Sequence, residues 1–250
     1  MHVKLIGSGW KNTSLVDVHG SVTFTLWLCM CNLKCPFCHN WRLASNEGSI
    51  CKPLDTSRLL DDLSASRGFI DYLHVTGGEP LLQYTALSWL FKEAKDMGVA
   101  TSLNSNLTLY MPLKKLVDQD VVDHVATDLK TPFDELSGLG DVSNVLFKQF
   151  MESLRLIVEK NIPLELRIPV AKDLTIKTLK KTLEYIMPTL SKHVENTVVI
   201  VNPLLSKPLT NPRSIEWCDK YCMPSEVELE GVAGVFRRLG FKTFIKEVPR

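Results

Sequence analysis

This chain of 250 residues lacks any apolar run long enough to cross a membrane, and residues 1–20 lack the apolar core of a signal peptide. It also lacks an excess of charge of one sign. Because 29 basic residues face 28 acidic ones, no overall field attracts a polyanion, and nucleic acid is not an expected partner. We therefore expect a cytoplasmic protein with reduced thiols and no membrane contact.

Internal repeats, low-complexity tracts and linker-like stretches are also missing from the sequence. The length suffices for one large α/β domain with a substantial core. We therefore expect a single domain over residues 1–250. Within it we distinguish a cysteine-rich loop at 29–40, a proline-rich loop at 202–225, and a C-terminal helix and strand at 226–250.

Strand-like and helix-like patterns alternate along the chain about six times. We expect strands at 22–28, 71–75, 99–103, 121–127, 163–168 and 197–201. We expect helices at 55–66, 81–97, 112–118, 143–160 and 175–187, then a closing helix at 226–239 and a strand at 241–246. Such alternation implies parallel strands joined by right-handed crossovers. The predicted fold class is α/β, a partial (β/α)6 barrel of parallel strands with outer helices.

Three cysteines, Cys31, Cys35 and Cys38, form a CxxxCxxC motif directly after the first of these strands, and no further cysteine follows within twelve residues. A 4Fe-4S cluster usually takes four cysteines, so three thiolates leave one iron open to another ligand. The spacing therefore predicts a reactive iron-sulfur centre. A Cys3His zinc site that includes His39 is the main alternative, and inert thiols are another. Disulfides are a weaker alternative, because the seven cysteines are odd in number.

Polar residues follow the ends of several predicted strands, where parallel α/β folds bind ligands. The second strand ends in Gly77-Gly78-Glu79-Pro80, and the third ends in Asn104-Ser105-Asn106. Two glycines allow backbone angles closed to other residues and a close approach of a ligand. Glu79 could accept hydrogen bonds from a cationic group there. Taken alone, however, this is also an ordinary strand-to-helix turn.

Two further charged pairs lie on the fourth and fifth predicted strands. Asp128 and Lys130 point to the same side of a strand end, where they could bind the two charges of a zwitterion or form a solvated turn. Glu165 and Arg167 alternate with an apolar set and should point to the inner face. Arg167 then needs an anionic partner, which is either Glu165 and its neighbours or a ligand carboxylate.

The other cysteines that the sequence analysis singles out are Cys51, Cys218 and Cys222. Cys218 and Cys222 are four residues apart and would share one face of a helix. They could bind an auxiliary cluster or a metal together with Cys51, but buried or incidental thiols are the prediction that we adopt.

Taken together, Cys31, Cys35 and Cys38 and the run Gly77-Gly78-Glu79-Pro80 resemble the motifs of the radical S-adenosylmethionine superfamily. Within it, the chain looks most like activating proteins of glycyl-radical enzymes, such as those of anaerobic ribonucleoside-triphosphate reductase and pyruvate formate-lyase. Residues 13–20, Cys38-His39-Asn40 and Asp128-Leu129-Lys130 carry this second likeness. Met30 and Leu107 depart from it, because both stand where these families often carry glycine.

The resemblance implies two cofactors, a 4Fe-4S cluster and S-adenosylmethionine. The three motif cysteines would be the metal ligands and catalytic residues. Gly77, Gly78 and Glu79 would bind the methionine ammonium, and Phe37 would lie against adenine. Lys130 and Asp128 would contact the methionine carboxylate and the ribose, with Asn104 and Asn106 nearby and Arg167 as a further candidate for the carboxylate.

The resemblance also implies an activity and partners. The protein would be an anaerobic oxidoreductase that cleaves S-adenosylmethionine reductively and places a glycyl radical on a partner enzyme. A flavodoxin- or ferredoxin-type protein would donate the electron. Two alternatives stay open: the same chemistry on RNA, a peptide or a small metabolite, and a non-catalytic zinc-binding module.

Overall fold

The computed structural model describes residues 4–247, and the chain divides into two compact units. Unit 1 comprises residues 1–32 and 42–126, and unit 2 comprises residues 33–41 and 127–250. Residues 248–250, which belong to the expected C-terminal segment, lie outside the described residues. The expectation of a single domain stays a prediction.

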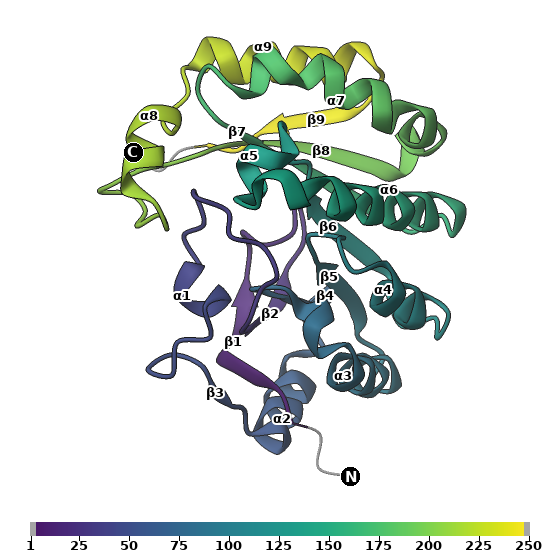
Figure 1. Ribbon diagram of the computed structural model, residues 1–250. Coiled ribbons are helices and arrows are strands. Elements are labelled where there is room, and N and C mark those ends of the chain that lie inside the picture. Colours follow the sequence, from purple (N-terminus) through teal and green to yellow (C-terminus); the bar gives the residue numbers. More distant parts are fainter. Residues whose placement is uncertain (1–3, 248–250) are drawn as a thin grey trace. The chain divides into compact units, whose positions relative to one another are not determined.

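Unit 1 contains a sheet in which the strand order is β3-β1-β2-β4-β5-β6. The strands are β1 (Ile6–Ser14), β2 (Thr23–Leu28), β3 (Lys52–Pro53), β4 (Tyr72–Gly77), β5 (Ala100–Asn104) and β6 (His124–Asp128), whose last two residues belong to unit 2. The neighbours from β2 to β6 pair in parallel, whereas β1 pairs antiparallel with both β2 and β3. Figure 1 shows these strands in purple to teal.

The crossovers of unit 1 are helical. They include α1 (Trp41–Ala44), α2 (Thr56–Ser66), the 3-10 turn η1 (Pro80–Gln83), α3 (Tyr84–Asp96) and α4 (Tyr110–Val117). Helix α3 illustrates why these segments fold: Leu87, Leu90, Phe91 and Ala94 follow helical spacing and are all fully buried, so one face packs into the core. Helix α2 begins at Asp55, whose carboxylate accepts the N–H of Arg58.

Unit 2 contains a parallel sheet with the strand order β7-β8-β9 (Figure 1). Its elements are α5 (Phe133–Ser137), η2 (Gly140–Val142), α6 (Ser143–Glu159), β7 (Leu164–Val170), α7 (Thr175–Leu190), η3 (Ser191–Asn196), β8 (Thr197–Pro203), α8 (Ile215–Tyr221), α9 (Glu226–Arg238) and β9 (Lys242–Ile245). Helices α7 and α9 contact the strands. Helix α9 starts with a capping box between Ser225 and Glu228.

The expected α/β class, in which parallel strands alternate with helices, is confirmed, and every expected strand and helix is present within a few residues of its predicted bounds. Strands β1 and β3 and helices α1, α5 and α8 were not predicted from the sequence. Strand β1 contains Gly7 and Gly9 and two register shifts, which break the alternation that marks a strand. Helix α8 forms inside the segment 202–225, which was expected to be a loop; this expectation was wrong.

Within residues 4–247, no helix combines the length and the apolar character that a membrane-spanning segment needs.

Candidate active site

Glu79 is the centre of the candidate site residues in unit 1. Its side chain is fully buried at the turn between β4 and η1. The carboxylate accepts hydrogen bonds from the N–H of Leu81 at 3.0 Å, the hydroxyl of Ser105 at 2.8 Å and the N–H of Asn106 at 2.7 Å. A buried carboxylate is stable only with such partners. Glu79 therefore joins the ends of β4 and β5.

Asn106 extends this network to the cysteine motif. Its amide Nδ2 donates to Asn32 Oδ1 at 2.9 Å and lies 3.9 Å from Cys31 Sγ. At the neighbouring strand end, Asn104 Nδ2 donates to the hydroxyl of Thr76 at 2.8 Å. The sequence analysis expected Asn104 and Asn106 at the site, but it gave no signal for the participation of Asn32, which follows Cys31 directly. In unit 1 the structure thus connects Cys31, Asn106 and Glu79.

The two glycines before Glu79 make room for the protein's own backbone. Gly77 has φ +116°, and a Cβ atom there would overlap the carbonyl of Leu28. A Cβ atom on Gly78 would overlap the carbonyl of Met30, which accepts the N–H of Glu79 at 2.7 Å. Close approach at this turn therefore requires glycine, and it holds the start of the cysteine loop against the turn.

In unit 2, the segment 33–41 contains Cys35 and Cys38 and is fixed by backbone hydrogen bonds. The N–H of Lys34 donates to Ser137 O at 2.9 Å, and the N–H of Ser214 donates to Pro36 O at 2.9 Å. Cys38 donates its N–H to Cys35 O at 3.2 Å, which closes a turn between the two cysteines. Residues from α5 and from the start of α8 therefore shape this turn.

Phe37, between these cysteines, packs in an aromatic and apolar cluster of unit 2. Its ring centroid lies 6.1 Å from that of Trp217 on α8. Trp217 in turn donates its indole N–H to Glu135 at 2.7 Å. The cluster also contains Leu136, Ala171, Leu204, Cys218 and Cys222. The sequence analysis missed Trp217, because it lies in the segment that was expected to be irregular.

The thiol of Cys35 has a perturbed pKa. Burial raises it from 9.0 to about 11, and the charge of nearby Lys130 opposes this only in part. Burial also lowers the pKa of His39, against the opposite effect of Asp128. In the metal-free protein near neutral pH, Cys35 is therefore protonated and His39 is neutral.

Asp128 and Lys130 form an ion pair at the end of β6, with Lys130 Nζ 3.1 Å from Asp128 Oδ2. The Lys130 side chain is only 5% exposed and the Asp128 side chain is 33% exposed, so this is no solvated turn. Burial on its own would raise the pKa of Asp128, but Lys130 and Arg167 outweigh it and hold the pKa below the ordinary value. The Asp128 carboxylate is therefore ionised at neutral pH.

Glu165 and Arg167 face the same side of β7, as the alternation predicted, and they pair with each other. Arg167 Nε lies 2.6 Å from Glu165 Oε1, and the side chains are 15% and 5% exposed for Arg167 and Glu165, respectively. Of the two anionic partners considered for Arg167, the structure contains the carboxylate of Glu165. Because Arg167 also lowers the pKa of Asp128, the two charged pairs of unit 2 interact.

The candidate residues thus form one group in each unit. Unit 1 carries Cys31, Gly77, Gly78, Glu79, Asn104 and Asn106, and unit 2 carries Cys35, Phe37, Cys38, Asp128, Lys130 and Arg167. Among residues 4–247, no group of three or more His, Cys, Asp or Glu side chains is arranged as a metal site. The ligand set of three cysteines stays a prediction.

The other four cysteines are paired in disulfides, Cys29 with Cys51 and Cys218 with Cys222. The expectation of buried thiols at Cys51, Cys218 and Cys222 was therefore wrong. Strand β1 pairs with both β2 and β3 and so brings Cys29, after β2, close to Cys51, before β3. This strand was missed in the sequence.

The motif cysteines Cys31, Cys35 and Cys38 take part in neither of these two disulfides. Three thiols on one short loop, with the other cysteines paired, match the donor chemistry of a cluster held at three of its irons. The residues present therefore fit a 4Fe-4S cluster.

A family model described as the radical SAM superfamily matches residues 28–186, which is more than half of the chain and includes both motifs. The chain belongs to the radical S-adenosylmethionine superfamily, and the predicted membership is confirmed. Membership implies a 4Fe-4S cluster and S-adenosylmethionine as cofactors.

Three curated relatives are similar over shorter stretches. A Methanocaldococcus jannaschii protein, provisionally named as a glycyl-radical enzyme activating enzyme, is 28% identical over 53% of this chain and 53% of its own length. A 7-carboxy-7-deazaguanine synthase of Hyperthermus butylicus is 32% identical over 38% of this chain and 39% of its own length. The pyruvate formate-lyase-activating enzyme of Staphylococcus aureus is 30% identical over 37% of this chain and 39% of its own length. The matches therefore span about half of these relatives or less.

A solved structure supports the fold. The crystal structure of Streptococcus suis SuiB bound to S-adenosylmethionine superimposes with a TM-score of 0.59 and covers 87% of this chain and 48% of that protein. The sequence identity is 12%, so this likeness concerns the fold alone.

Proposed function

We propose that this protein is a radical S-adenosylmethionine enzyme that generates a glycyl radical on a partner enzyme. One observation supports the chemistry above all: the cysteines left free of disulfides are the three of the CxxxCxxC motif. The likeness to two activating enzymes supports the choice of a glycyl residue as the target.

In this proposal, Cys31, Cys35 and Cys38 would hold a 4Fe-4S cluster at three of its irons, which would leave one iron open to S-adenosylmethionine. When bound, the cluster supplies the electron that cleaves the sulfonium to methionine and a 5′-deoxyadenosyl radical. The protein's own residues bind, orient and exclude water.

The proposed binding roles follow the charges of the candidate residues in unit 1 and in unit 2. Glu79, with the backbone of Gly77 and Gly78, orients the methionine ammonium, and Asn104 and Asn106 line the same strand ends. Lys130 and Asp128 contact the carboxylate and the ribose, and Arg167 adds positive charge beside them. Phe37 lies against the adenine. The buried ion pairs support these roles because each holds a cationic and an acidic side chain side by side.

The test is anaerobic reconstitution with iron and sulfide, followed by dithionite and S-adenosylmethionine. We expect 5′-deoxyadenosine, and a glycyl radical signal in electron paramagnetic resonance when the partner glycyl-radical enzyme is present. Cys38→Ala should abolish both products, whereas Cys218→Ser, outside the motif, should keep them. A fully reconstituted protein that forms no 5′-deoxyadenosine would refute the proposal.

A second candidate is the same cleavage directed at a small heterocyclic metabolite. The likeness to a 7-carboxy-7-deazaguanine synthase favours it. Formation of 5′-deoxyadenosine that depends on such a substrate, without a glycyl radical on any partner, would favour this candidate. One zinc per chain without acid-labile sulfide would instead favour the non-catalytic module with a Cys3His site.

A further inference from the structure

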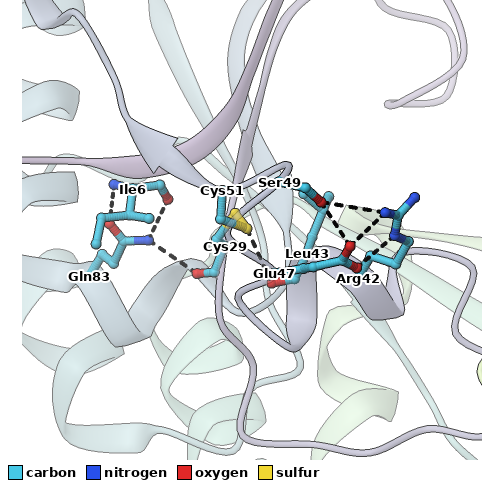
Figure 2. The surroundings of a disulfide bond; sticks show 8 residues. All are labelled: Ile6, Cys29, Arg42, Leu43, Glu47, Ser49, Cys51 and Gln83. Carbon is cyan, nitrogen blue, oxygen red and sulfur yellow. Dashed lines mark hydrogen bonds and ion pairs between the residues drawn. A yellow bond between two sulfur atoms is a disulfide. The ribbon is translucent and has the colours of Figure 1, made fainter.

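The Cys29–Cys51 disulfide encloses the whole predicted ligand set. The two cysteines are 22 residues apart, with a Cα–Cα distance of 6.0 Å, and Cys31, Cys35 and Cys38 all lie between them in the sequence. Figure 2 shows this bond and its surroundings. The bond thus closes a loop whose first residues include the predicted ligand Cys31.

One end of this disulfide is fixed to the sheet of unit 1. Cys29 is fully buried directly after β2, and its N–H donates to Ile6 O at 2.9 Å. The side chain of Gln83 donates to Cys29 O at 3.1 Å and to Ile6 O at 2.9 Å, and it accepts the N–H of Ile6 at 2.8 Å (Figure 2). Cys29 therefore has little freedom to move.

The other end holds a compact turn over residues 42–51. The N–H of Cys51 donates to Glu47 O at 2.8 Å, and the Glu47 carboxylate pairs with Arg42 at 2.6 Å (Figure 2). This turn carries the carbonyls of Leu43 and Ala44. They accept the N–H groups of Met30 at 2.9 Å and Cys31 at 3.1 Å, respectively.

We propose that Cys29–Cys51 is a redox-sensitive brace, which holds the turn 42–51 against Met30 and Cys31 when oxidised and releases it on thiol–disulfide exchange with a dithiol. The disulfide brace itself does not depend on enzymatic activity. Its effect on the cluster rests on the proposed function, in which Cys31 is a ligand. In its oxidised form, the Cys29–Cys51 disulfide keeps Cys31 in place in the protein without the cluster.

Reduction of the disulfide takes two thiol–disulfide exchange steps. A thiolate of the dithiol attacks Cys51 Sγ, the partly exposed sulfur, because Cys29 is fully buried. The Cys29–Cys51 bond breaks, Cys29 leaves as a thiolate and takes a proton, and the second thiol of the reductant displaces Cys51. The protein gains two electrons and two protons, and the dithiol becomes a disulfide. The freed Cys51 thiol can then donate to Leu43 O, which lies 3.8 Å from its sulfur.

Hydrogen exchange of the iron-free protein tests the brace without any need for activity. Protein oxidised with a low-molecular-weight disulfide should yield a Cys29–Cys51 cross-linked peptide in mass spectrometry. After reduction with dithiothreitol, the Met30 and Cys31 amides should exchange about tenfold faster, because their acceptors are no longer held. Reoxidation should restore the slow rate.

Two variants identify which disulfide is responsible. In Cys51→Ser, these amides should exchange fast whether or not reductant is present. In Cys218→Ser, the matched control in unit 2, they should still respond to reductant as in the wild type. If Cys51→Ser does not fold, the reversible change in amide exchange of the wild-type protein tests the brace.

Unpaired Cys29 and Cys51 after oxidation, or exchange that does not change on reduction, would overturn the brace. A redox response in a protein that forms no 5′-deoxyadenosine would leave the brace standing and remove the proposed function. An active enzyme in which amide exchange at Met30 and Cys31 does not respond to reduction would overturn the brace and leave the proposed function standing.

Discussion

At the scale of single residues, burial of the Cys35 thiol has a direct chemical consequence. With its pKa raised to about 11, roughly one Cys35 in a thousand is a thiolate at pH 8. Only the thiolate reacts with iodoacetamide, so labelling of Cys35 in iron-free protein should accelerate about tenfold per pH unit up to pH 10. Peptide mass spectrometry measures this rate.

The control for Cys35 is the same protein in urea, where exposure should bring the labelling rate to a plateau near pH 9. A plateau near pH 9 in the folded protein would contradict the prediction. In the proposed function Cys35 is a metal ligand and must be deprotonated, so loading the cluster should release the Cys35 proton and should be slower in acid.

Lys130 and Asp128 allow a second prediction at this scale. Lys130→Met leaves a partly buried carboxylate without its nearest cation, and we expect a loss of about 2 kcal/mol in the free energy of unfolding at pH 7. In the wild type, the lowered pKa of Asp128 adds stability above the ordinary value near 3.8, and this contribution is lost as the pH falls through the folded value.

The variant should raise the pKa of Asp128, so its deficit relative to the wild type should be smaller at pH 4.5 than at pH 7. Urea unfolding of iron-free protein at both values measures this. The double variant Asp128→Asn/Lys130→Met should lose less than Lys130→Met alone. With Asp128→Asn as the second single variant, a loss in the double variant equal to the sum of the two single losses would mean that the pair does not interact.

Met30 and Leu107 show what sequence reasoning could and could not supply for single residues. Both were noted as departures from glycine in the resembling families. The structure keeps positive φ angles at both, +73° at Met30 and +58° at Leu107. The resemblance therefore identified two positions with a left-handed backbone conformation. It could not predict that complete burial of the Leu107 side chain would offset the backbone strain there.

At the scale of elements, Gly138 links α5 to the cysteine turn. It ends α5 with φ +70°, and a Cβ atom there would overlap the backbone carbonyl of Lys34. We expect Gly138→Ala to lower the free energy of unfolding by more than about 2 kcal/mol, because strain and a backbone clash add. Urea unfolding measures the loss.

Gly140→Ala is the matched control for Gly138→Ala. Gly140 also has a positive φ, +54°, but open space surrounds the site of its Cβ atom. We expect a loss of about 1 kcal/mol from backbone strain alone. Equal losses in the two variants would show that the contact with Lys34 does not matter.

Periodicity predicted the long elements because burial of one face dictates their pattern. The alternation of Leu164, Leu166 and Ile168 with Glu165 and Arg167 even placed the two charged residues on one face of β7, where they pair. Strand β1 and the short helices α5 and α8 carry no such pattern, because glycines, bulges and proline-rich flanks interrupt them. Their absence from the prediction hid the acceptor Ser137, the partner Trp217 and both disulfides.

At the scale of the whole molecule, the cysteine pairing limits how much iron the chain can hold. With Cys29, Cys51, Cys218 and Cys222 in disulfides, we expect about four irons per chain after anaerobic reconstitution, which is the content of one 4Fe-4S cluster. Iron and sulfide analysis measures this. The double variant Cys218→Ser/Cys222→Ser should bind as much iron as the wild type.

A content near eight irons per chain in the wild type would contradict this prediction, and it would restore the auxiliary cluster. The motif itself was predictable from sequence, because three thiols within eight residues are a local signal. The pairing of the other cysteines was not, because it depends on which strands become neighbours.

The backbone contacts of the cysteine turn also set an order of events during synthesis. The hydrogen bond from the N–H of Ser214 to Pro36 O cannot form until Ser214 is translated, 178 residues after Pro36. At usual elongation rates, that interval lasts roughly 10 to 35 seconds. Throughout this interval, Cys35 and Cys38 are translated but lack the contact with Ser214. In the proposed function, in which Cys35 and Cys38 are cluster ligands, we therefore expect iron and sulfide to enter this turn after translation, and a nascent chain stalled before α8 to be a poor acceptor for the cluster.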